Sequence, residues 1–347
     1  MNYTDLYRDD IRRIIPGIPG IERLKGTSVL ITGATGMLCS VVADTLMFYN
    51  KGHGAGIKVL LAGRSRERMA ARFSAFEEGN DYKFLPYDAT KTEPFSCNAD
   101  YLIHGAGNAN PVIYTEQPVE TMLANFIGLD MLLKSMAGTS AKRLLYISSS
   151  EVYGRKEGRE PYSEEDYGFL DILNPRACYP SAKRAAETLC AAYFEEYGVE
   201  SVIVRPGHIY GPSITESDSR ASAQFTRDAV SGDSIVMKSA GTQLRSYCYI
   251  ADCASAVLTV LLEGEAGCAY NISNPYSVVT IRKMAECLAE AAGTDVVFED
   301  PTLKEQKGYN LMDDSSLRAE SLLRLGWKPL FGIEEGAGHT VSIMKNE

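Results

Sequence analysis

The segment from residue 28 to residue 207 alternates between short apolar runs and longer helical patterns, and this alternation restricts the fold more than any other feature. Strands are expected at 28–33, 58–63, 82–88, 99–107, 142–150 and 201–207. Helices are expected between several of them, at 65–79, 119–137 and 184–198, of which the amphipathic stretch 119–137 is the longest. Short apolar strands joined by helices are typical of a parallel sheet covered on both faces. The sequence therefore predicts an α/β fold with a doubly wound parallel sheet.

A glycine-bearing turn follows the first strand. Gly33 permits a tight turn there, and Gly36 lets backbone amides approach a pyrophosphate at the N-terminus of the next helix. Cys39 occupies the position of a usual third glycine, at the cost of modest crowding. Because this turn lies between the strand and the helix of the first βαβ unit, it predicts a site for NAD or NADP.

The residues after the second strand bear on the choice between NAD and NADP. An acid at this place binds the ribose hydroxyls of NAD, whereas arginine accommodates the extra phosphate of NADP. The chain has Arg64, Ser65 and Arg66 and no acid, which favours NADP; the alternative is a solvated basic start to a helix. Asp88, after the third strand, is expected to accept a hydrogen bond from the adenine amino group, unless it only caps a turn.

The alternating pattern loosens after residue 207 into turns, shorter helices and isolated strands. We interpret 26–206 as a Rossmann-type NAD(P)-binding domain and 207–347 as mostly a smaller substrate-binding lobe, some of whose segments return to the first domain. Residues 1–25 carry apolar residues near helical spacing that end at the PGIPG stretch. This extension is expected to be a capping helix or a subunit-contact arm.

Composition argues against several classes of partner. The 347 residues are 45% apolar and carry a formal net charge of −10, so a general electrostatic grip on nucleic acid or acidic lipid is not expected. The chain has no apolar run of 18 residues and no signal-peptide pattern at its start. The eight cysteines form no Cys-x-x-Cys pair and have no histidine at zinc spacing. We expect reduced, mostly buried thiols, no metal and a cytoplasmic location.

Tyr179 and Lys183 lie one helical turn apart before the sixth strand and so share a helix face. A lysine in this position can lower the pKa of the phenol, and the phenolate can remove a hydroxyl proton as hydride leaves the same carbon. The fifth strand runs into Ser149 and Glu151. Ser149 is expected to bind the oxygen that Tyr179 deprotonates, and Glu151 to move a proton on the adjacent carbon, unless it is a salt-bridged loop acid.

Together these segments resemble the extended short-chain dehydrogenase/reductases that act on nucleotide sugars, the NAD-dependent epimerase/dehydratase family. The resemblance covers roughly residues 26–335 and rests on the glycine turn, the helix that contains Asn125, and the motifs HGAGNANP, SSSEVYG, NPRACYPSAKRAAETL, VRPGHIYGP, GTQLRSYCYIAD, YNISN and LGWKP. Within the family, the motifs are most similar to those of UDP-glucuronate decarboxylases, with dTDP-glucose 4,6-dehydratases second.

The resemblance implies hydride transfer at carbon 4 of a nucleotide-linked sugar. It implies that Tyr179 is the base, that Lys183 orients the cofactor ribose, that Ser149 polarises the carbon 4 oxygen and that Glu151 is the second acid or base. The expected cofactor contacts are Gly33, Thr35, Gly36, Met37, Leu38, Arg64, Ser65, Asp88, Ala89, Gly105, Ala106, Asn125, Tyr179 and Lys183. The expected substrate contacts are Asn108, Ser150, His208, Arg220 and Arg245, of which the two arginines have surface salt bridges as the alternative.

Three departures from the family pattern narrow the reaction. Ser150 replaces the aspartate that dehydratases use, so elimination of water lacks its usual acid. His208 replaces an asparagine near the substrate, and KEQKGYNLMDD (304–314) replaces the arginine-rich segment of the decarboxylases. An NADPH-dependent reductase of a keto nucleotide sugar and a non-catalytic dinucleotide sensor or scaffold remain alternatives. By analogy the chain forms a homodimer through a four-helix bundle made by 119–137 and 184–198.

Overall fold

The structure is a computed structural model, and it describes residues 2–92, 95, 98–107, 109–158, 160–300 and 312–346. Its largest element is a seven-stranded sheet in which every pair of neighbours is parallel, in the order β10-β6-β5-β4-β1-β2-β3. The strands are β1 (Ser28–Thr32), β2 (Lys58–Gly63), β3 (Lys83–Pro86), β4 (Tyr101–His104), β5 (Arg143–Ile147), β6 (Ser201–Pro206) and β10 (Ala269–Ile272). This order is that of a Rossmann sheet and confirms the predicted fold class.

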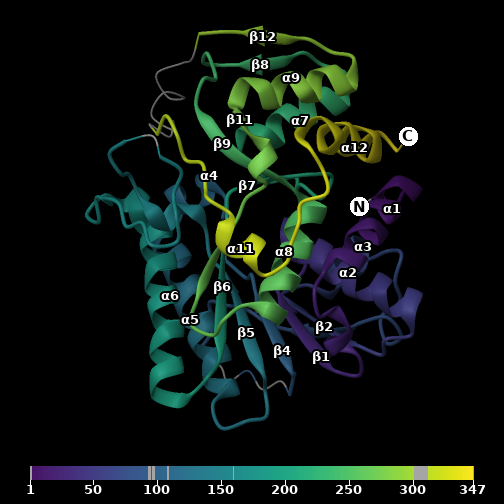
Figure 1. Ribbon diagram of the computed structural model, residues 1–347, viewed down its shortest axis with the longest axis vertical. Helices are drawn as coiled ribbons and strands as arrows, with labels where there is room; N and C mark the ends of the chain where they lie inside the picture. The colour runs from purple at the N-terminus through teal and green to yellow at the C-terminus, as the bar shows by residue number, and fades with distance from the viewer. Residues whose placement is uncertain are drawn as a thin grey trace.

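Both faces of the sheet are buried, which explains its uninterrupted apolar strands. On β1, Val29 and Ile31 join the core that includes α2 (Met37–His53) and α8 (Ile250–Glu263). Leu30 points the other way, into the core shared with α5 (Pro118–Met136) and α6 (Cys178–Tyr197). Successive side chains of a strand alternate between faces, so each strand serves both layers (Figure 1). Figure 1 shows α5 and α6 on one side of the sheet and α2 and α8 on the other.

Two helices differ from the sequence-based expectation. The helix expected over 65–79 ends early, as α3 (Arg66–Arg72), because Phe73 and Phe76 turn into the core beside α2. The helix expected over 184–198 begins earlier, at Cys178, so Tyr179 and Lys183 lie within α6 itself. A short helix, α4 (Pro111–Glu116), precedes α5.

The upper part of the molecule in Figure 1 contains two small sheets and three helices. One sheet has the order β11-β9-β7 and the other pairs β12 with β8. These strands are β7 (His208–Tyr210), β8 (Ile235–Met237), β9 (Leu244–Tyr249), β11 (Val278–Thr280) and β12 (Val296–Phe298). The helices are α7 (Ala221–Ser231), α9 (Ile281–Ala292) and α12 (Ile333–Lys345), with α11 (Glu320–Arg324) lower down. Although α8 and β10 follow residue 207, they pack with the first sheet; the boundary itself remains a prediction.

Short 3-10 helices connect several of these elements. They are η1 (Ile15–Gly17), η2 (Ile21–Leu24), η3 (Ser150–Tyr153), η4 (Pro175–Ala177) and η5 (Pro275–Ser277). η3 follows β5 directly and η4 leads into α6, so both lie at the carboxyl end of the central sheet, where ligands bind in open α/β folds.

The N-terminal helix α1 (Asp5–Ile14) packs on this chain's own α2, α8 and α12. Tyr3 and Tyr7 both donate hydrogen bonds to the buried Asp44 of α2, at 2.8 and 2.5 Å. Arg72 of α3 donates to the same carboxylate at 2.7 Å and to the Tyr3 hydroxyl at 2.7 Å. We call these four residues the Asp44 cluster. Its carboxylate charge is matched by a guanidinium inside the protein, so the N-terminal extension is fixed to the dinucleotide-domain helices.

Two further expectations concern the whole chain. Within the described ranges, none of the cysteines forms a disulfide, and all but Cys268 are buried, while Cys97 lies outside those ranges. No helix among the described residues has both the length and the apolar character needed to cross a bilayer.

Candidate active site

The glycine turn between β1 and α2 forms a backbone cradle. Gly33 has a φ of +66°, and a Cβ there would meet the backbone of Gly105 at 2.7 Å. Gly36 is the N-cap of α2 and supplies no side chain to its first amides. Backbone amides at the start of a long helix bind phosphate oxygens. The turn therefore fits the pyrophosphate of a dinucleotide, with Met37 and Leu38 opening the helix beside it.

Arg64, Ser65 and Arg66 were predicted to favour NADP, and they differ in whether another side chain already binds them. The Ser65 hydroxyl caps α3 and donates to Glu67 at 2.7 Å. Arg66 is ion-paired with Glu78 and lies over a phenylalanine ring. Arg64 has an electrostatic effect on the carboxylate at position 88 and is the basic side chain nearest in sequence to the end of β2. Any preference for an added phosphate therefore depends mainly on Arg64.

Asp88 follows the end of β3 and Asn125 lies on α5, and both were predicted to contact the cofactor. The Asp88 carboxylate accepts hydrogen bonds from the amide and hydroxyl of Thr90, at 3.0 and 2.8 Å, and these bonds lower its pKa. Asp88 therefore caps a turn, and its contact with adenine remains a prediction. Asn125 is buried on α5 and donates to the carbonyl of Thr121 at 2.8 Å, with its amide oxygen against Gly107. It thus supports the Gly105–Gly107 turn opposite Gly33.

Tyr179 and Lys183 are both buried near the start of α6. Burial raises the pKa of Tyr179, as does the charge of Glu151, whereas a hydrogen bond with Ser149 lowers it. The Lys183 Nζ donates to the carbonyl of Ile147 at 2.8 Å and lies 5.7 Å from the centre of the Tyr179 ring. Burial therefore has the largest effect on the pKa of the phenol in this structure, and the lowering of that pKa by Lys183 stays a prediction.

Lys183 is itself strongly affected by its surroundings. Burial lowers its pKa to about 7, and Glu187, one helical turn further along α6, opposes that shift. Glu187 is bound by the Ser148 hydroxyl at 2.5 Å and by Arg205 at 2.6 Å. The sequence analysis did not single out Glu187 or Arg205. Their buried ion pair keeps a negative charge near the lysine, which favours its protonated form.

Glu151 lies in η3, next to Ser149, whose hydroxyl accepts a hydrogen bond from the Glu151 amide at 3.2 Å. The Glu151 carboxylate accepts from the Tyr114 hydroxyl at 3.1 Å and from Arg176 at 3.3 Å. Arg176 also donates to the Tyr114 hydroxyl at 2.9 Å. Glu151 is therefore both a salt-bridged acid and a neighbour of Tyr179. We call Tyr114, Glu151 and Arg176 the Glu151 cluster.

The predicted substrate contacts come mainly from the upper part of the molecule. Among the described residues His208 Nδ1 has no hydrogen-bond partner, and burial together with Arg245 and Arg220 lowers its pKa to about 3, so the imidazole is neutral. Arg220 pairs with Asp218 and reaches the Met37 sulfur at 3.1 Å, beside the glycine turn. Ser150 opens η3 and is half-buried, whereas Asn108 lies outside the described residues.

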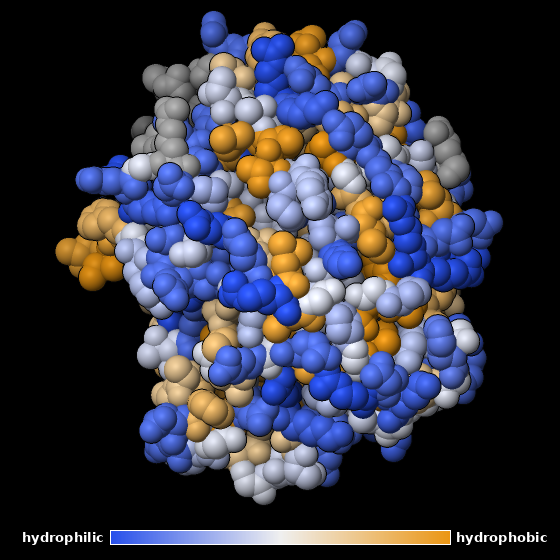
Figure 2. Space-filling view, viewed as in Figure 1, coloured by the Kyte–Doolittle hydropathy of each residue, from blue (hydrophilic) through white to orange (hydrophobic). Residues whose placement is uncertain are grey.

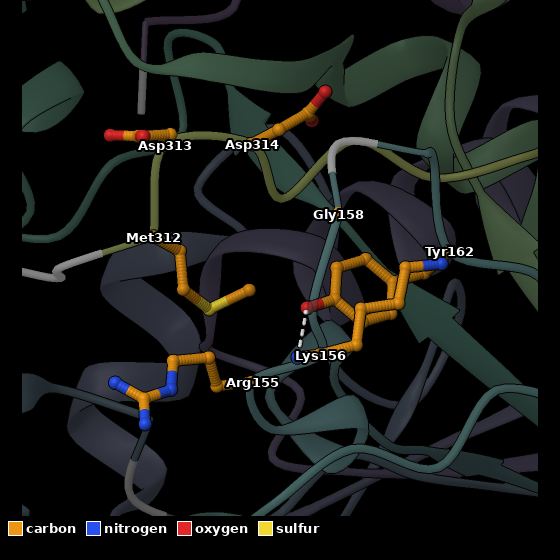
Figure 3. A pocket seen from close by; sticks show the side chains of 7 residues that line it. All are labelled: Arg155, Lys156, Gly158, Tyr162, Met312, Asp313 and Asp314. Carbon is orange, nitrogen blue, oxygen red and sulfur yellow. Dashed lines mark hydrogen bonds between the residues drawn. The ribbon is translucent and has the colours of Figure 1, made fainter.

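Arg245 is almost fully buried. Its guanidinium donates to the carbonyls of Leu244 and Met312, at 2.7 and 3.0 Å. Arg245 is therefore not a surface salt bridge, whereas Arg220 does form an ion pair with Asp218 and its side chain is 33% accessible. A cavity of about 340 Å³ borders the Met312 segment (Figure 3). It is lined by Arg155, Lys156, Gly158, Tyr162, Met312, Asp313 and Asp314, so it is distinct from the space around Tyr179.

The sequence analysis missed Tyr114 and Arg176. Arg176 precedes Tyr179 by three residues, within the NPRACYPSAKRAAETL motif, so its nearness to the phenol was readable from sequence. Tyr114 comes from α4, more than sixty residues earlier, and only the tertiary structure places its ring on that of Tyr179, at 5.1 Å between centroids and 12° between planes.

Comparisons with known proteins identify the family and the fold of the chain. Residues 29–273 match the model of the NAD dependent epimerase/dehydratase family. UDP-glucuronic acid decarboxylase 1 of Xenopus tropicalis is 31% identical over 92% of this chain and 72% of its own length. UDP-glucuronic acid 4-epimerase from Bacillus cereus, solved with UDP-glucuronic acid and NAD, has a TM-score of 0.75 at 19% identity, over 92% of this chain and 99% of that chain. The dTDP-glucose 4,6-dehydratase from Bacillus anthracis str. Ames, with NAD, has a TM-score of 0.74 at 18% identity, over 92% and 97%.

Proposed function

This chain belongs to the NAD-dependent epimerase/dehydratase family, and from that premise we propose that it decarboxylates UDP-glucuronate through oxidation at carbon 4. One observation carries the proposal: Ser149, Glu151 and Tyr179 meet where β5 and α6 open toward the glycine turn, and the residue between the first two is a serine. That arrangement supplies a base and one further acid, but no second acid to expel water. Loss of carbon dioxide needs no such acid, because a carbon 4 ketone accepts the electron pair.

In the proposed reaction the glycine turn of Gly33 and Gly36 would hold NAD, which would supply a reversible hydride acceptor for carbon 4. Tyr179 removes the carbon 4 hydroxyl proton while Ser149 holds that oxygen. The bond between carbon 5 and the carboxylate then breaks, its electron pair moves toward the carbon 4 carbonyl, and carbon dioxide leaves. Glu151 takes a proton from solvent and delivers it to carbon 5, and Tyr179 returns its proton to the carbon 4 oxygen as the hydride returns to carbon 4. The products are UDP-xylose and carbon dioxide.

We propose that Lys183 binds the nicotinamide ribose and, once there, offsets the high pKa of the phenol. The Lys183 Nζ is held by the Ile147 carbonyl and lies 5.7 Å from the centre of the Tyr179 ring, on the same face of α6. Met37, Leu38, Asn125 and the Gly105–Gly107 turn would complete the cofactor site. His208, Arg220 and Arg245 would face the sugar and diphosphate.

The proposal is tested with purified full-length protein and UDP-glucuronate. We expect UDP-xylose by mass spectrometry, one equivalent of carbon dioxide, and NAD released in stoichiometric amount when the protein is denatured. Consumption of free NADPH with a keto nucleotide sugar would instead support the reductase alternative. Binding of a dinucleotide without turnover of any nucleotide sugar would support the sensor or scaffold.

A preference for NADP belongs to the reductase alternative, and Arg64 is the residue that supports it. Arg64→Ala should weaken NADPH binding about tenfold and leave NADH binding within about twofold, since only the added phosphate needs the guanidinium. Arg12→Ala, at an exposed arginine of α1, is the matched control. Equal weakening of both cofactors by Arg64→Ala, or of neither, would assign the chain to NAD.

We also propose that the chain forms a homodimer through α5 and α6. α5 exposes Val119, Met122, Leu123 and Phe126, each at least 43% accessible, and α6 exposes Phe194 and Tyr197. Apolar side chains exposed along packed neighbouring helices commonly mark an interface. The face shown in Figure 2 is mixed, with an apolar projection at its left edge. Light scattering should give twice the chain mass, and Leu123→Glu should give the single mass.

A further inference from the structure

We infer that Arg176 and Tyr114 are positioning residues that hold Glu151 as an oriented carboxylate beside Tyr179. The inference rests on the proposed function, because it assigns the two residues to the step in which Glu151 moves a proton. They act through Glu151 and Tyr179, and neither is assigned a proton transfer of its own.

The Glu151 cluster is a closed triangle of hydrogen bonds. One Glu151 oxygen accepts from the Tyr114 hydroxyl at 3.1 Å and the other accepts from Arg176 Nη1 at 3.3 Å. Arg176 Nη2 donates to the Tyr114 hydroxyl at 2.9 Å, and the guanidinium lies 4.4 Å from the centre of the Tyr114 ring. Each of the three side chains thus restrains the other two. Because both carboxylate oxygens are engaged, rotation of the Glu151 side chain breaks at least one of these bonds.

Tyr114 also links this triangle to the proposed base. Its ring stacks on that of Tyr179, with 5.1 Å between centroids and 12° between planes, and its hydroxyl is bonded to Glu151. The Cys178 thiol donates to the Tyr114 carbonyl at 3.3 Å, which fixes the end of α4 against the start of α6. The two groups that move protons in the proposed reaction therefore share one intervening aromatic ring.

Arg176 has a second effect, on the charge felt by the phenol. The charge of Glu151 raises the pKa of Tyr179, and the charge of Arg176 lowers it. Arg176 therefore offsets part of the effect of Glu151 on the phenol, which must itself lose a proton in the proposed reaction. The titratable and charged side chains that face Tyr179 are Tyr114 of α4, Tyr146 of β5, Glu151 of η3, Arg176 of η4, Lys183 of α6 and Arg220 before α7.

The Glu151 cluster is partly exposed to solvent, which distinguishes it from a buried cluster that only stabilises the fold. The side chains of Arg176 and Glu151 are 47% and 35% accessible, while Tyr114 is buried. An exposed ion pair contributes little to stability. The bonds to Tyr114 and the stack on Tyr179 give the pair an orientation that stability alone does not require, and its open side leaves Glu151 accessible to a ligand.

The experiment follows the two half-reactions separately in holoenzyme mixed with UDP-glucuronate. Absorbance at 340 nm reports the first half-reaction, reduction of the bound cofactor, which requires Tyr179. Release of carbon dioxide and UDP-xylose reports the second half-reaction, which we call completion. The variants are Arg176→Met, Arg176→Lys and Tyr114→Phe, with Arg12→Met as a control that removes an exposed, ion-paired arginine from α1.

For Arg176→Met we expect completion to slow about 10²-fold, with reduced cofactor accumulating, since the acid is no longer held in place. We also expect the pH midpoint of cofactor reduction to rise by about one unit, because a charge that lowers the pKa of Tyr179 has been removed. Arg176→Lys should restore the pH midpoint but not the rate of completion, because lysine keeps the charge and loses the two-pronged geometry. Tyr114→Phe should slow completion about tenfold and leave the pH midpoint in place.

The inference would be overturned if the wild type turns over UDP-glucuronate and the Arg176→Met and Tyr114→Phe variants keep the rates of both half-reactions within about twofold of it. Failure of the wild type to act on UDP-glucuronate would instead sink the proposed function, and the triangle is then tested without substrate. Denaturant midpoints of Arg176→Met, Glu151→Gln and the double variant must be non-additive, with the double loss smaller than the sum of the single losses. Additive losses would show that the triangle does not hold Glu151.

Discussion

The same three chemical groups meet at two places in this molecule. In the Asp44 cluster, tyrosine hydroxyls and Arg72 donate to a carboxylate that is fully buried, and Arg72 is 11% accessible. In the Glu151 cluster, Tyr114 and Arg176 donate to a carboxylate that is 35% accessible. Both contain an arginine that also donates to a tyrosine hydroxyl. The two clusters differ in how accessible the carboxylate is to solvent. They also differ in that the ring of Tyr179 stacks on Tyr114 of the Glu151 cluster.

This difference separates a polar cluster that stabilises from one that can react. A buried charge must be fully paired, and removal of its partner leaves an uncompensated charge in a low dielectric. A half-exposed pair contributes little to folding, but a ligand can reach it. We therefore expect substitutions in the Asp44 cluster to change stability and matched substitutions around Glu151 and Tyr179 to change activity.

The sharpest contrast is between two substitutions that each remove one phenolic oxygen. Tyr179→Phe should lower turnover of UDP-glucuronate by about 10³- to 10⁴-fold, because the proposed base is lost, and should barely change the unfolding midpoint. Tyr7→Phe should leave turnover of the folded enzyme unchanged but cost about 1–3 kcal/mol of unfolding free energy, since Asp44 loses a buried donor. Steady-state kinetics and urea titration measure both. Unchanged turnover in Tyr179→Phe would refute the enzymatic assignment.

The next contrast is between the two arginines. Arg72→Met should cost about 3–5 kcal/mol of unfolding free energy, because Asp44 would remain buried without its cation. Arg176→Met should cost less than about 1 kcal/mol, since the pair it breaks is half exposed. Chemical denaturation of both variants decides the matter. Equal losses would show that access does not distinguish the two clusters.

A third contrast lies in the pH dependence of stability. Burial lowers the pKa of Lys183 to about 7 in the folded chain, whereas the unfolded chain keeps the ordinary value. Between those two values Lys183 binds more protons in the unfolded state, so this lysine contributes a rise in unfolding free energy with pH from about 7 to about 10.5. Lys183→Met should flatten that slope and stabilise the unliganded chain by about 2 kcal/mol at pH 7. An unchanged slope in Lys183→Met would contradict a pKa of Lys183 that burial lowers to about 7.

Local patterns predicted the parts of the molecule that depend on neighbours in sequence. The strands followed from short apolar runs, because strands buried on both faces are continuously apolar. Tyr179 and Lys183 were proposed because their helical spacing comes with Ser149 and Glu151 at the end of the fifth strand, where such sheets bind ligands. The early end of α3 was not predicted, since Phe73 and Phe76 read equally well as helix and are placed by the core beside α2.

What the sequence could not indicate are contacts between distant elements. Tyr114 reaches Glu151 from another helix, and Glu78 pairs with Arg66 from twelve residues further along the chain. The bond between Ser65 and Glu67 is local, two residues apart. Three side chains, those of Arg64, Ser65 and Arg66, were expected to bind the added phosphate of NADP. Carboxylates already engage Ser65 and Arg66, which weakens the sequence-based preference for NADP. A residue's type shows what it can bind, but which partner it meets depends on the fold.

The central claim is that Tyr179 begins the reaction and Glu151 completes it. It is tested most directly by adding UDP-glucuronate to Glu151→Gln holoenzyme and recording absorbance at 340 nm in a single turnover. The account predicts that the signal rises as in the wild type and then persists, with UDP-xylose formed at least about 10²-fold more slowly. A signal that never rises, or that rises and decays at the wild-type rate, would contradict it.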